Sequence, residues 1–193
     1  MIFSIVAIII GYLSGSIPMG YLVARLYGVD VTSTGSGRIG GTNVLRAAGA
    51  TAAGLTVLGD VLKGMIPTLL LVSAGMPLTA SLAGAAAVLG HNHSIFLRFR
   101  GGVGAGTAIG VIGALSFPVG LLTAFCGLVA LALSRYASIL STTIAVSSVV
   151  FLTLFAWLGY TPYEYIAGAV VIMLLIVNAL RPNYARLRAG TER

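Results

Sequence analysis

The stretch GAGTAIGVIGALSFPVGLLTAFCGLVALALSRY, residues 104–136, decides the fold because its only charged residue is the penultimate one. A membrane-spanning helix needs about 20 predominantly apolar residues, so this stretch is unusually long for one helix. Pro118 lies near its middle, where a proline starts or breaks a helix. We therefore expect a tight hairpin near Ser116 and Pro118, with two short helices over 105–116 and 117–134. Helices this short are stable in a membrane only where other parts of the protein cover them.

The composition indicates an integral membrane protein. Hydrophobic residues make up 58% of the 193 residues and charged residues only 8%, against about a quarter in soluble domains. The mean hydropathy is +1.05. A net charge of +7 indicates orientation in the membrane and anionic partners, such as lipid head groups or phosphates, rather than nucleic acid. The single cysteine, Cys126, lies in an apolar run, which excludes a disulfide framework and a CxxC metal or redox motif.

The other apolar stretches predict five further spans, roughly at 2–24, 52–73, 78–96, 139–158 and 164–180. With the N-terminus outside, a seven-span arrangement places every basic residue on the cytoplasmic side, as the positive-inside rule requires. In the alternative arrangement with six spans, Arg135 and the arginine-rich tail lie on opposite sides of the membrane, which weakens the positive-inside pattern. We expect the first helix to be retained, because no basic region precedes it. The predicted fold is an all-α integral membrane protein, a single-domain bundle of seven transmembrane helices over 1–193, with the C-terminus in the cytoplasm.

The polar segments fall on the predicted cytoplasmic side. In TSTGSGRIGGTNVLRAAG, residues 32–49, repeated glycines free backbone N–H groups to approach an anion. Hydrogen-bond donors and positive charge come from Ser36, Thr42, Asn43, Arg38 and Arg46. The segment contains a G-x-G-x-x-G match but no preceding strand, which excludes a dinucleotide-binding motif. A phosphate or carboxylate cradle is the functional interpretation, and a flexible basic loop is the alternative.

A second glycine-rich segment is GHNHSIFLRFRGGVGAGTAIG, residues 90–110. Its glycines precede a predicted helix, whose N-terminal amides and dipole favour a bound anion. No Gly-Lys-Ser/Thr follows, which argues against ATP hydrolysis. His91 is a candidate general base or phosphate donor, with a structural interfacial histidine as the alternative. No cysteine or carboxylate converges on His91 and His93, so we predict no metal site.

Charged residues also occur inside an apolar stretch. Asp60 and Lys63 are three residues apart and therefore face the same side of a helix. Ionisable residues in a membrane span indicate function, and a mutual ion pair is the alternative explanation. Arg135, with Ser138 and Ser141, marks another junction at the cytoplasmic side. The basic tail could be an anchor to anionic lipid.

Five motifs resemble, in order and spacing, the bacterial acyl phosphate:glycerol-3-phosphate acyltransferases: GSGRIGGTNVLRAAG, GDVLKG, GHNHSIFLRFRGGVGAGT, RYASILS and NYARLRAGTE. The resemblance implies a multi-pass cell-membrane enzyme of phospholipid biosynthesis, without a cofactor, whose active site faces the cytoplasm. It implies transfer of a fatty acyl group from acyl phosphate to the 1-hydroxyl of glycerol 3-phosphate, giving lysophosphatidic acid and inorganic phosphate. Membrane lipids are the other expected partners, and the sequence leaves the oligomeric state open.

This chemistry suits the residues. Acyl phosphate is a mixed anhydride with a good leaving group, so the substrate hydroxyl can attack directly once its proton is removed. Either His91 or a substrate phosphate can serve as the base. Ser36, Thr42 and Asn43 can stabilise the oxyanion. An HxxxxD acyltransferase motif is absent, because Phe96 and Arg98 follow the two histidines at the fifth position.

The resemblance matches Ser36, Arg46, Gly101, Gly102, Gly104, Asn183 and Glu192 to functional positions of the family, and the residue types and spacing add the other candidates, which fall into two groups. The candidate catalytic residues are Ser36, Thr42, Asn43, Arg46 and His91. The candidate substrate- and phosphate-binding residues are Arg38, Lys63, Arg100, Gly101, Gly102, Gly104, Thr107, Arg135, Ser138, Ser141, Asn183 and Glu192.

The chain departs from the family pattern at four positions. Val103 replaces a phosphate-binding lysine, Leu180 a histidine, Arg38 an asparagine and Ser94 a proline. Arg38 or Arg100 could compensate for the lost lysine, because a guanidinium binds phosphate bidentately. A divergent paralogue, non-catalytic or with another acceptor, is therefore one alternative. A small anion transporter is the other, although the predicted outer segments SAGMPLT and GYTPYEY contain no basic residue.

Overall fold

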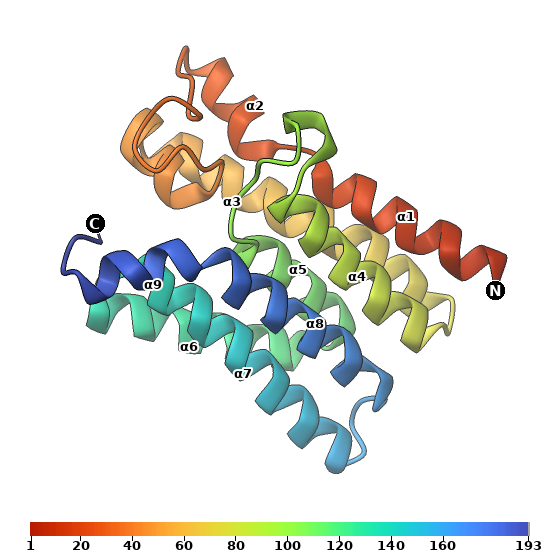
Figure 1. The fold of residues 1–193 in the computed structure, drawn as a ribbon. Helices are drawn as coiled ribbons and strands as arrows, with labels where there is room; N and C mark the ends of the chain where they lie inside the picture. Colours follow the sequence, from red (N-terminus) through yellow and green to blue (C-terminus); the bar gives the residue numbers. More distant parts are fainter. Residues whose placement is uncertain (193) are drawn as a thin grey trace.

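The computed structural model describes residues 1–192, and within them the regular elements are helices, apart from an isolated bridge between Ser94 and Arg100. Figure 1 shows long helices running side by side. The elements are α1 (Ile2–Ser16), α2 (Met19–Leu26), α3 (Gly41–Ser73), α4 (Pro77–Asn92), η1 (Ile95–Leu97), α5 (Ala105–Leu115), α6 (Phe117–Ser134), α7 (Ala137–Trp157), α8 (Glu164–Ala179) and α9 (Arg181–Arg188). The predicted all-α fold is confirmed.

The stretch 104–136 forms the expected helical hairpin. α5 ends at Leu115 and α6 begins at Phe117, with Ser116 in an extended conformation between them. The backbones approach closely, because a Cβ atom at Gly120 would overlap the backbone of Gly113. With 11 residues, α5 is about 17 Å long, too short to cross the hydrocarbon core alone. It packs among α3, α4, α6 and α7, which supply the cover that a short helix needs.

Two helix boundaries differ from the prediction. The single helix expected over 2–24 is broken, because Ile17 and Pro18 separate α1 from α2 and Pro18 has no N–H to continue the helical hydrogen bonds. α3 begins at Gly41, well before the predicted span over 52–73, and bends at Gly49, whose φ is 87°. The polar turns before this bend are therefore helical.

Small residues bring α1 against α4. Cβ atoms at Gly11 and Gly15 would overlap the backbones of Ala83 and Ala87. The spacing is that of a small-xxx-small motif, which allows close helix packing in membranes where lipid competes equally well for large apolar side chains. The α1–α4 contact therefore depends on backbone approach rather than on bulky side chains.

The outer surface carries large exposed hydrophobic side chains along α1, α3, α6 and α7. Within residues 1–192, four segments are long and apolar enough to span a membrane: Ile2–Leu26, Gly41–Ser73, Phe117–Ser134 and Ala137–Trp157. A fifth is possible if α8 and α9, bent by 51°, count together. The chain is therefore a multi-pass membrane protein.

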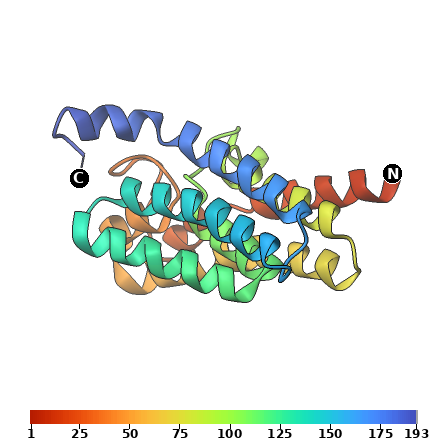
Figure 2. The ribbon, with the colours of Figure 1, turned by 90° about the horizontal axis from the view of Figure 1, so that it is seen from below.

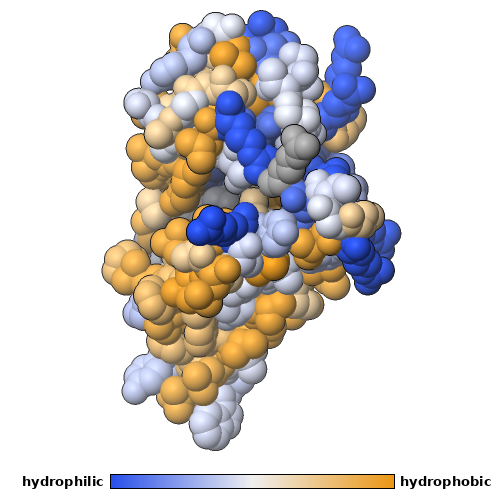
Figure 3. All heavy atoms as spheres, turned by 90° about the vertical axis from the view of Figure 1, so that its left-hand side faces the viewer, coloured by the Kyte–Doolittle hydropathy of each residue, from blue (hydrophilic) through white to orange (hydrophobic). Residues whose placement is uncertain are grey.

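The polar segments gather at one end of the molecule. Figures 1 and 2 place the segment between α2 and α3, the start of α7 and the C-terminal tail at the end opposite the N-terminus. Figure 3 looks onto that end and shows hydrophilic side chains around a recess, with apolar side chains along the flanks. This end is where the candidate site lies.

Candidate active site

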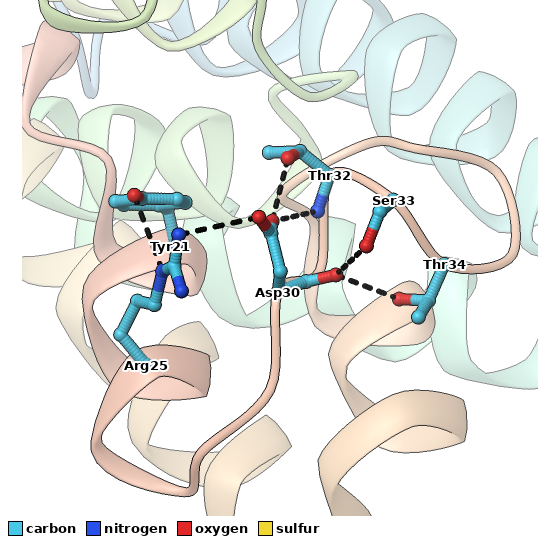
Figure 4. Close-up of polar contacts among 6 residues, drawn as sticks. All are labelled: Tyr21, Arg25, Asp30, Thr32, Ser33 and Thr34. Atoms are coloured by element: carbon cyan, nitrogen blue, oxygen red, sulfur yellow. Dashed lines mark hydrogen bonds and ion pairs between the residues drawn. The ribbon is translucent and has the colours of Figure 1, made fainter.

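Asp30 fixes the start of the segment that joins α2 to α3 (Figure 4). Its Oδ1 accepts hydrogen bonds from the Thr32 backbone N–H at 3.0 Å and the Thr32 hydroxyl at 2.6 Å. Its backbone carbonyl accepts from the hydroxyls of Ser33 and Thr34, and its Oδ2 lies 3.2 Å from the Arg25 guanidinium. The hydrogen bond from the Thr32 hydroxyl is the main cause of a lowered pKa for the Asp30 carboxyl. Local contacts thus give this segment a defined conformation.

Asn43, in the first turn of α3, shapes the rest of the segment. Its side chain is buried, and its Nδ2 donates to the carbonyls of Val31, Thr34 and Arg38 at 2.8 to 3.1 Å. Its Oδ1 accepts from the Ser36 backbone N–H at 3.1 Å. The polar atoms of Asn43 are thus occupied within the segment, and the amide holds the backbone at Ser36 in place.

Three of the predicted catalytic residues are exposed at this end. The Ser36 side chain lies on the outside of the segment that Asn43 organises, and Thr42 and Arg46 are exposed in the first turns of α3. Thr42 and Arg46 are four residues apart in a helix, so they share a face. The bend at Gly49 separates this face from the membrane-spanning part of α3.

The C-terminal tail folds back onto α7. Glu192 accepts hydrogen bonds from the Ser138 hydroxyl and from the Asn183 Nδ2, each at 2.8 Å. Thr142 and Tyr184 add a hydroxyl–hydroxyl contact of 2.8 Å between α7 and α9. The structure therefore brings together Ser138, Asn183 and Glu192, which are far apart in the sequence.

Arg38 links the first motif to the same region. Its Nη2 donates to the carbonyl of Ala179, the last residue of α8, at 2.7 Å. Burial lowers the pKa of its guanidinium, the Arg186 charge lowers it further, and Glu192 raises it. A guanidinium stays protonated despite such a shift, because its ordinary pKa exceeds about 12. We call Arg38, Ser138, Asn183 and Glu192 the tail cluster.

The tail cluster contains buried polar atoms that make no hydrogen bond with the described residues. Nine buried side-chain polar atoms of the described residues have no hydrogen-bond partner, and two of them, Arg38 Nη1 and Asn183 Oδ1, belong to the tail cluster. Buried polar groups are almost always satisfied in folded proteins, so each exception calls for an explanation. A bound polar ligand would provide one.

The glycine loop, residues 101–104, packs on the end of α4. A Cβ atom at Gly101 would overlap the carbonyl oxygens of His91 and Asn92, and one at Gly102 would overlap His91 Nε2. The Gly102 N–H donates to the His91 carbonyl at 3.1 Å. Gly104, with φ of 96°, is the N-cap of α5. These contacts give the glycines a packing role, and their predicted part in phosphate binding stays a prediction.

Asp60, Lys63 and His91 meet inside the helix bundle. Asp60 Oδ1 lies 2.8 Å from Lys63 Nζ and 3.3 Å from His91 Nδ1. Lys63 Nζ also donates to the carbonyl of Ile17 at 2.8 Å. The three residues are 3%, 6% and 2% exposed. The ion pair that was the alternative explanation for Asp60 and Lys63 is present, and it occupies the ammonium that was predicted to bind phosphate.

The remaining predicted residues divide by exposure. Arg100 and Arg135 are exposed. Thr107 is fully buried beside Gly64 of α3, and the buried Ser141 hydroxyl donates to the carbonyl of Ala137 at 2.9 Å. The Thr107 hydroxyl has no hydrogen-bond partner among the described residues, and its predicted role stays a prediction.

At two of the positions that depart from the family pattern, Leu180 and Ser94, the side chain makes contacts within the protein. Leu180 is 1% exposed and belongs to the apolar core. The Ser94 hydroxyl donates to the carbonyl of Ser16, at the end of α1. Sequence reasoning also missed Asp30, although an Asp two residues before a Thr is typical of an Asx-turn.

These features define a class: a multi-pass, all-helical membrane protein with apolar flanks and a basic polar site at one end. A family model described as "Glycerol-3-phosphate acyltransferase" matches residues 5–190. The chain therefore belongs to the glycerol-3-phosphate acyltransferase family.

Close relatives cover nearly the whole chain. A glycerol-3-phosphate acyltransferase from Rubrobacter xylanophilus is 45% identical over 192 residues, which cover 98% of this chain and 94% of that protein. A crystal structure of PlsY (YgiH), an integral membrane glycerol 3-phosphate acyltransferase, in its glycerol 3-phosphate form is similar with a TM-score of 0.91 at 37% identity, covering 98% of this chain and 94% of that one. Its lysophosphatidic acid form has a TM-score of 0.89 at the same identity and coverage.

Proposed function

We propose that this chain is an acyltransferase that moves a fatty acyl group from acyl phosphate to the 1-hydroxyl of glycerol 3-phosphate. The products are lysophosphatidic acid and inorganic phosphate. Membership of the family over nearly the whole chain supports this function. The observation that carries the assignment of the site is the tail cluster at the polar end, where the Arg38 guanidinium is held on the Ala179 carbonyl near Glu192 and its Nη1 has no hydrogen-bond partner among the described residues.

In this proposal Arg38 binds a substrate phosphate. A guanidinium offers paired N–H donors that match phosphate oxygens, and Nη2 already anchors the side chain on Ala179. Such an arginine would replace the lysine that the family pattern has at Val103. Arg46 and Arg100, both exposed, add positive charge for the second phosphate substrate.

The reaction needs no nucleophile from the protein. The 1-hydroxyl oxygen attacks the acyl carbonyl carbon, the bond from that carbon to the phosphate oxygen breaks, and phosphate leaves with the electron pair. The Ser36 hydroxyl donates to the carbonyl oxygen as it gains negative charge. The His91 ring nitrogens face Asp60 and Gly102, so we assign the proton to a substrate phosphate oxygen rather than to His91.

We also propose seven membrane crossings, with the polar end in the cytoplasm. The hairpin between α5 and α6 supports the count, and the arginines near the polar end support the orientation. Cysteine accessibility tests both. In a Cys126→Ser background, Ser116→Cys should react with an impermeant maleimide from outside the cell, and labelling only from inside would contradict the arrangement.

The activity is tested with purified protein in lipid-containing detergent, supplied with palmitoyl phosphate with and without glycerol 3-phosphate. We expect phosphate release and lysophosphatidic acid formation that depend on the acceptor. A known active relative is assayed in parallel. If only the relative turns over, the chain is the divergent paralogue that Val103 and Leu180 make conceivable.

A further inference from the structure

The geometry points to a positioning role for Asp60, Lys63 and His91, which we call the buried brace. We infer that the buried brace holds the glycine loop against the break between α1 and α2, so that the loop presents its backbone to substrate in a fixed place. This role rests on the proposed function. It assigns Asp60, Lys63 and His91 to positioning rather than to contact with substrate.

The buried brace connects three parts of the chain: α3, α4 and the end of α1. Asp60 and Lys63 belong to α3, and His91 belongs to the last turn of α4. Lys63 Nζ reaches the carbonyl of Ile17, which follows the last residue of α1. A second contact reinforces this link, because the Ser14 hydroxyl donates to the Lys63 carbonyl at 2.8 Å.

The glycine loop rests directly on His91. The Gly102 N–H donates to the His91 carbonyl, and the Gly102 α-carbon faces His91 Nε2 so closely that no side chain fits between them. Gly106, in the first turn of α5, lies over Asp60, with 3.3 Å from its Cβ position to Asp60 Cβ. The loop and the start of α5 therefore take their position from the buried brace.

The charges suit positioning rather than binding. Asp60 Oδ1 lies within ion-pair distance of both Lys63 Nζ and His91 Nδ1, although neither Asp60 Oδ1 nor His91 Nδ1 has a contact with hydrogen-bond geometry among the described residues. Lys63 Nζ has a second partner in the Ile17 carbonyl. The side chains of these residues are almost fully buried. A buried ion pair often adds little stability over apolar residues of similar shape, so its retention in a membrane helix indicates a demand for defined geometry.

The test separates positioning from stability. A single variant such as Lys63→Met leaves Asp60 buried without its ammonium, and its lost activity would be uninformative. The double variant Asp60→Leu/Lys63→Met removes both charges while keeping side chains of similar shape, which restores thermal stability. We expect its kcat/KM to stay about tenfold to hundredfold below that of the natural chain, because the glycine loop is misplaced. Recovery of kcat/KM together with the melting temperature would overturn the inference.

A second measurement reports the position of the glycine loop without an activity assay. In a Cys126→Ser background, Val103→Cys reports the accessibility of the glycine loop to a maleimide. We expect its labelling rate to rise when Asp60→Leu/Lys63→Met is added, and an unchanged rate would overturn the inference. Thr68→Val is the matched control, because Thr68 is a fully buried hydroxyl in the same helix that bonds only to Gly64. If the natural chain shows no turnover, the proposed function fails, while the labelling result still decides the role of the buried brace.

Discussion

The buried brace and the tail cluster contain the same kinds of groups in opposite surroundings. Each has a carboxylate, Asp60 or Glu192, and a cationic side chain, Lys63 or Arg38. In the buried brace the ammonium lies against a carboxylate and donates to a backbone carbonyl. In the tail cluster, Arg38 Nη1 has no hydrogen-bond partner among residues 1–192. The difference teaches that a role in substrate binding should be assigned to a cationic residue of a motif only after its contacts within the protein are known.

Mutations in the two clusters should therefore have different effects, one mainly on the stability of the fold and the other mainly on substrate. Removing a group from the buried brace leaves a buried charge unpaired, which destabilises the fold. Removing an exposed group of the polar end affects mainly substrate, and removing Arg38 also breaks one hydrogen bond, to the Ala179 carbonyl. Four predictions sharpen or break the comparison, and they are ordered by expected free energy.

The largest effect is expected for Lys63→Met. The Asp60 carboxylate would remain buried without its ammonium, at a cost of about 3–5 kcal/mol in the free energy of unfolding. Thermal unfolding in detergent should show a large fall in melting temperature, and Thr68→Val should show a much smaller one. A melting temperature equal to that of the natural chain would show that the ion pair does not stabilise the fold.

The next effect is expected for Ser36→Ala. Because the Ser36 side chain is exposed, the melting temperature should not change, whereas kcat should fall by about 10²- to 10³-fold through loss of the oxyanion donor. Ser33→Ala, in the same segment, is the matched control and should retain activity. Equal kcat values for the two variants would remove Ser36 from the mechanism.

A smaller effect is expected for Arg38→Ala. Loss of a charged donor should raise the KM for glycerol 3-phosphate about tenfold to hundredfold. Arg38→Lys keeps the positive charge but not the paired N–H donors of a guanidinium, so its KM should lie between those of the natural chain and Arg38→Ala. An unchanged KM in Arg38→Ala means that Arg38 does not compensate for the missing lysine at Val103.

The smallest effect concerns Asp30 and pH. Its carboxyl pKa is lowered by the Thr32 hydroxyl, so its contribution to stability is present above the ordinary aspartate pKa of about 3.9. That contribution is lost as the pH falls through the lower pKa of the folded state. Melting temperatures measured on acidification should fall slightly more for the natural chain than for Asp30→Asn. Parallel curves for the two proteins would show that Asp30 adds no pH-dependent stability.

Local features of the sequence predicted most of the helices. The hairpin at Ser116 followed from a proline in an overlong apolar run. Helical spacing placed Asp60 and Lys63 on one face, and of the two explanations for them the ion pair is the one that is present. The break at Ile17 was missed because apolar residues continue on both sides of Pro18. The early start of α3 was missed because a segment rich in glycine and threonine is typical of a loop, whereas Val44 and Ala52 of this helix are buried in one apolar cluster with Val23 and Ala24 of α2.

The candidate site was less predictable, because its geometry depends on residues far apart in the chain. No spacing rule connects Ser138 with Glu192 or Arg38 with the end of α8. Likewise, His91 joins Asp60 only when α3 and α4 pack together. The motifs indicated which residues matter, and the fold determines which of them are available to substrate.

The central claim is that substrate phosphate binds at Arg38 of the tail cluster, whereas the buried brace only positions the glycine loop. A structure of this protein with glycerol 3-phosphate bound tests it most directly. We predict that the phosphate oxygens lie within about 3 Å of the Arg38 guanidinium nitrogens, while Lys63 Nζ stays on Asp60. A phosphate bound to Lys63 Nζ, with Arg38 remote from it, would contradict the account.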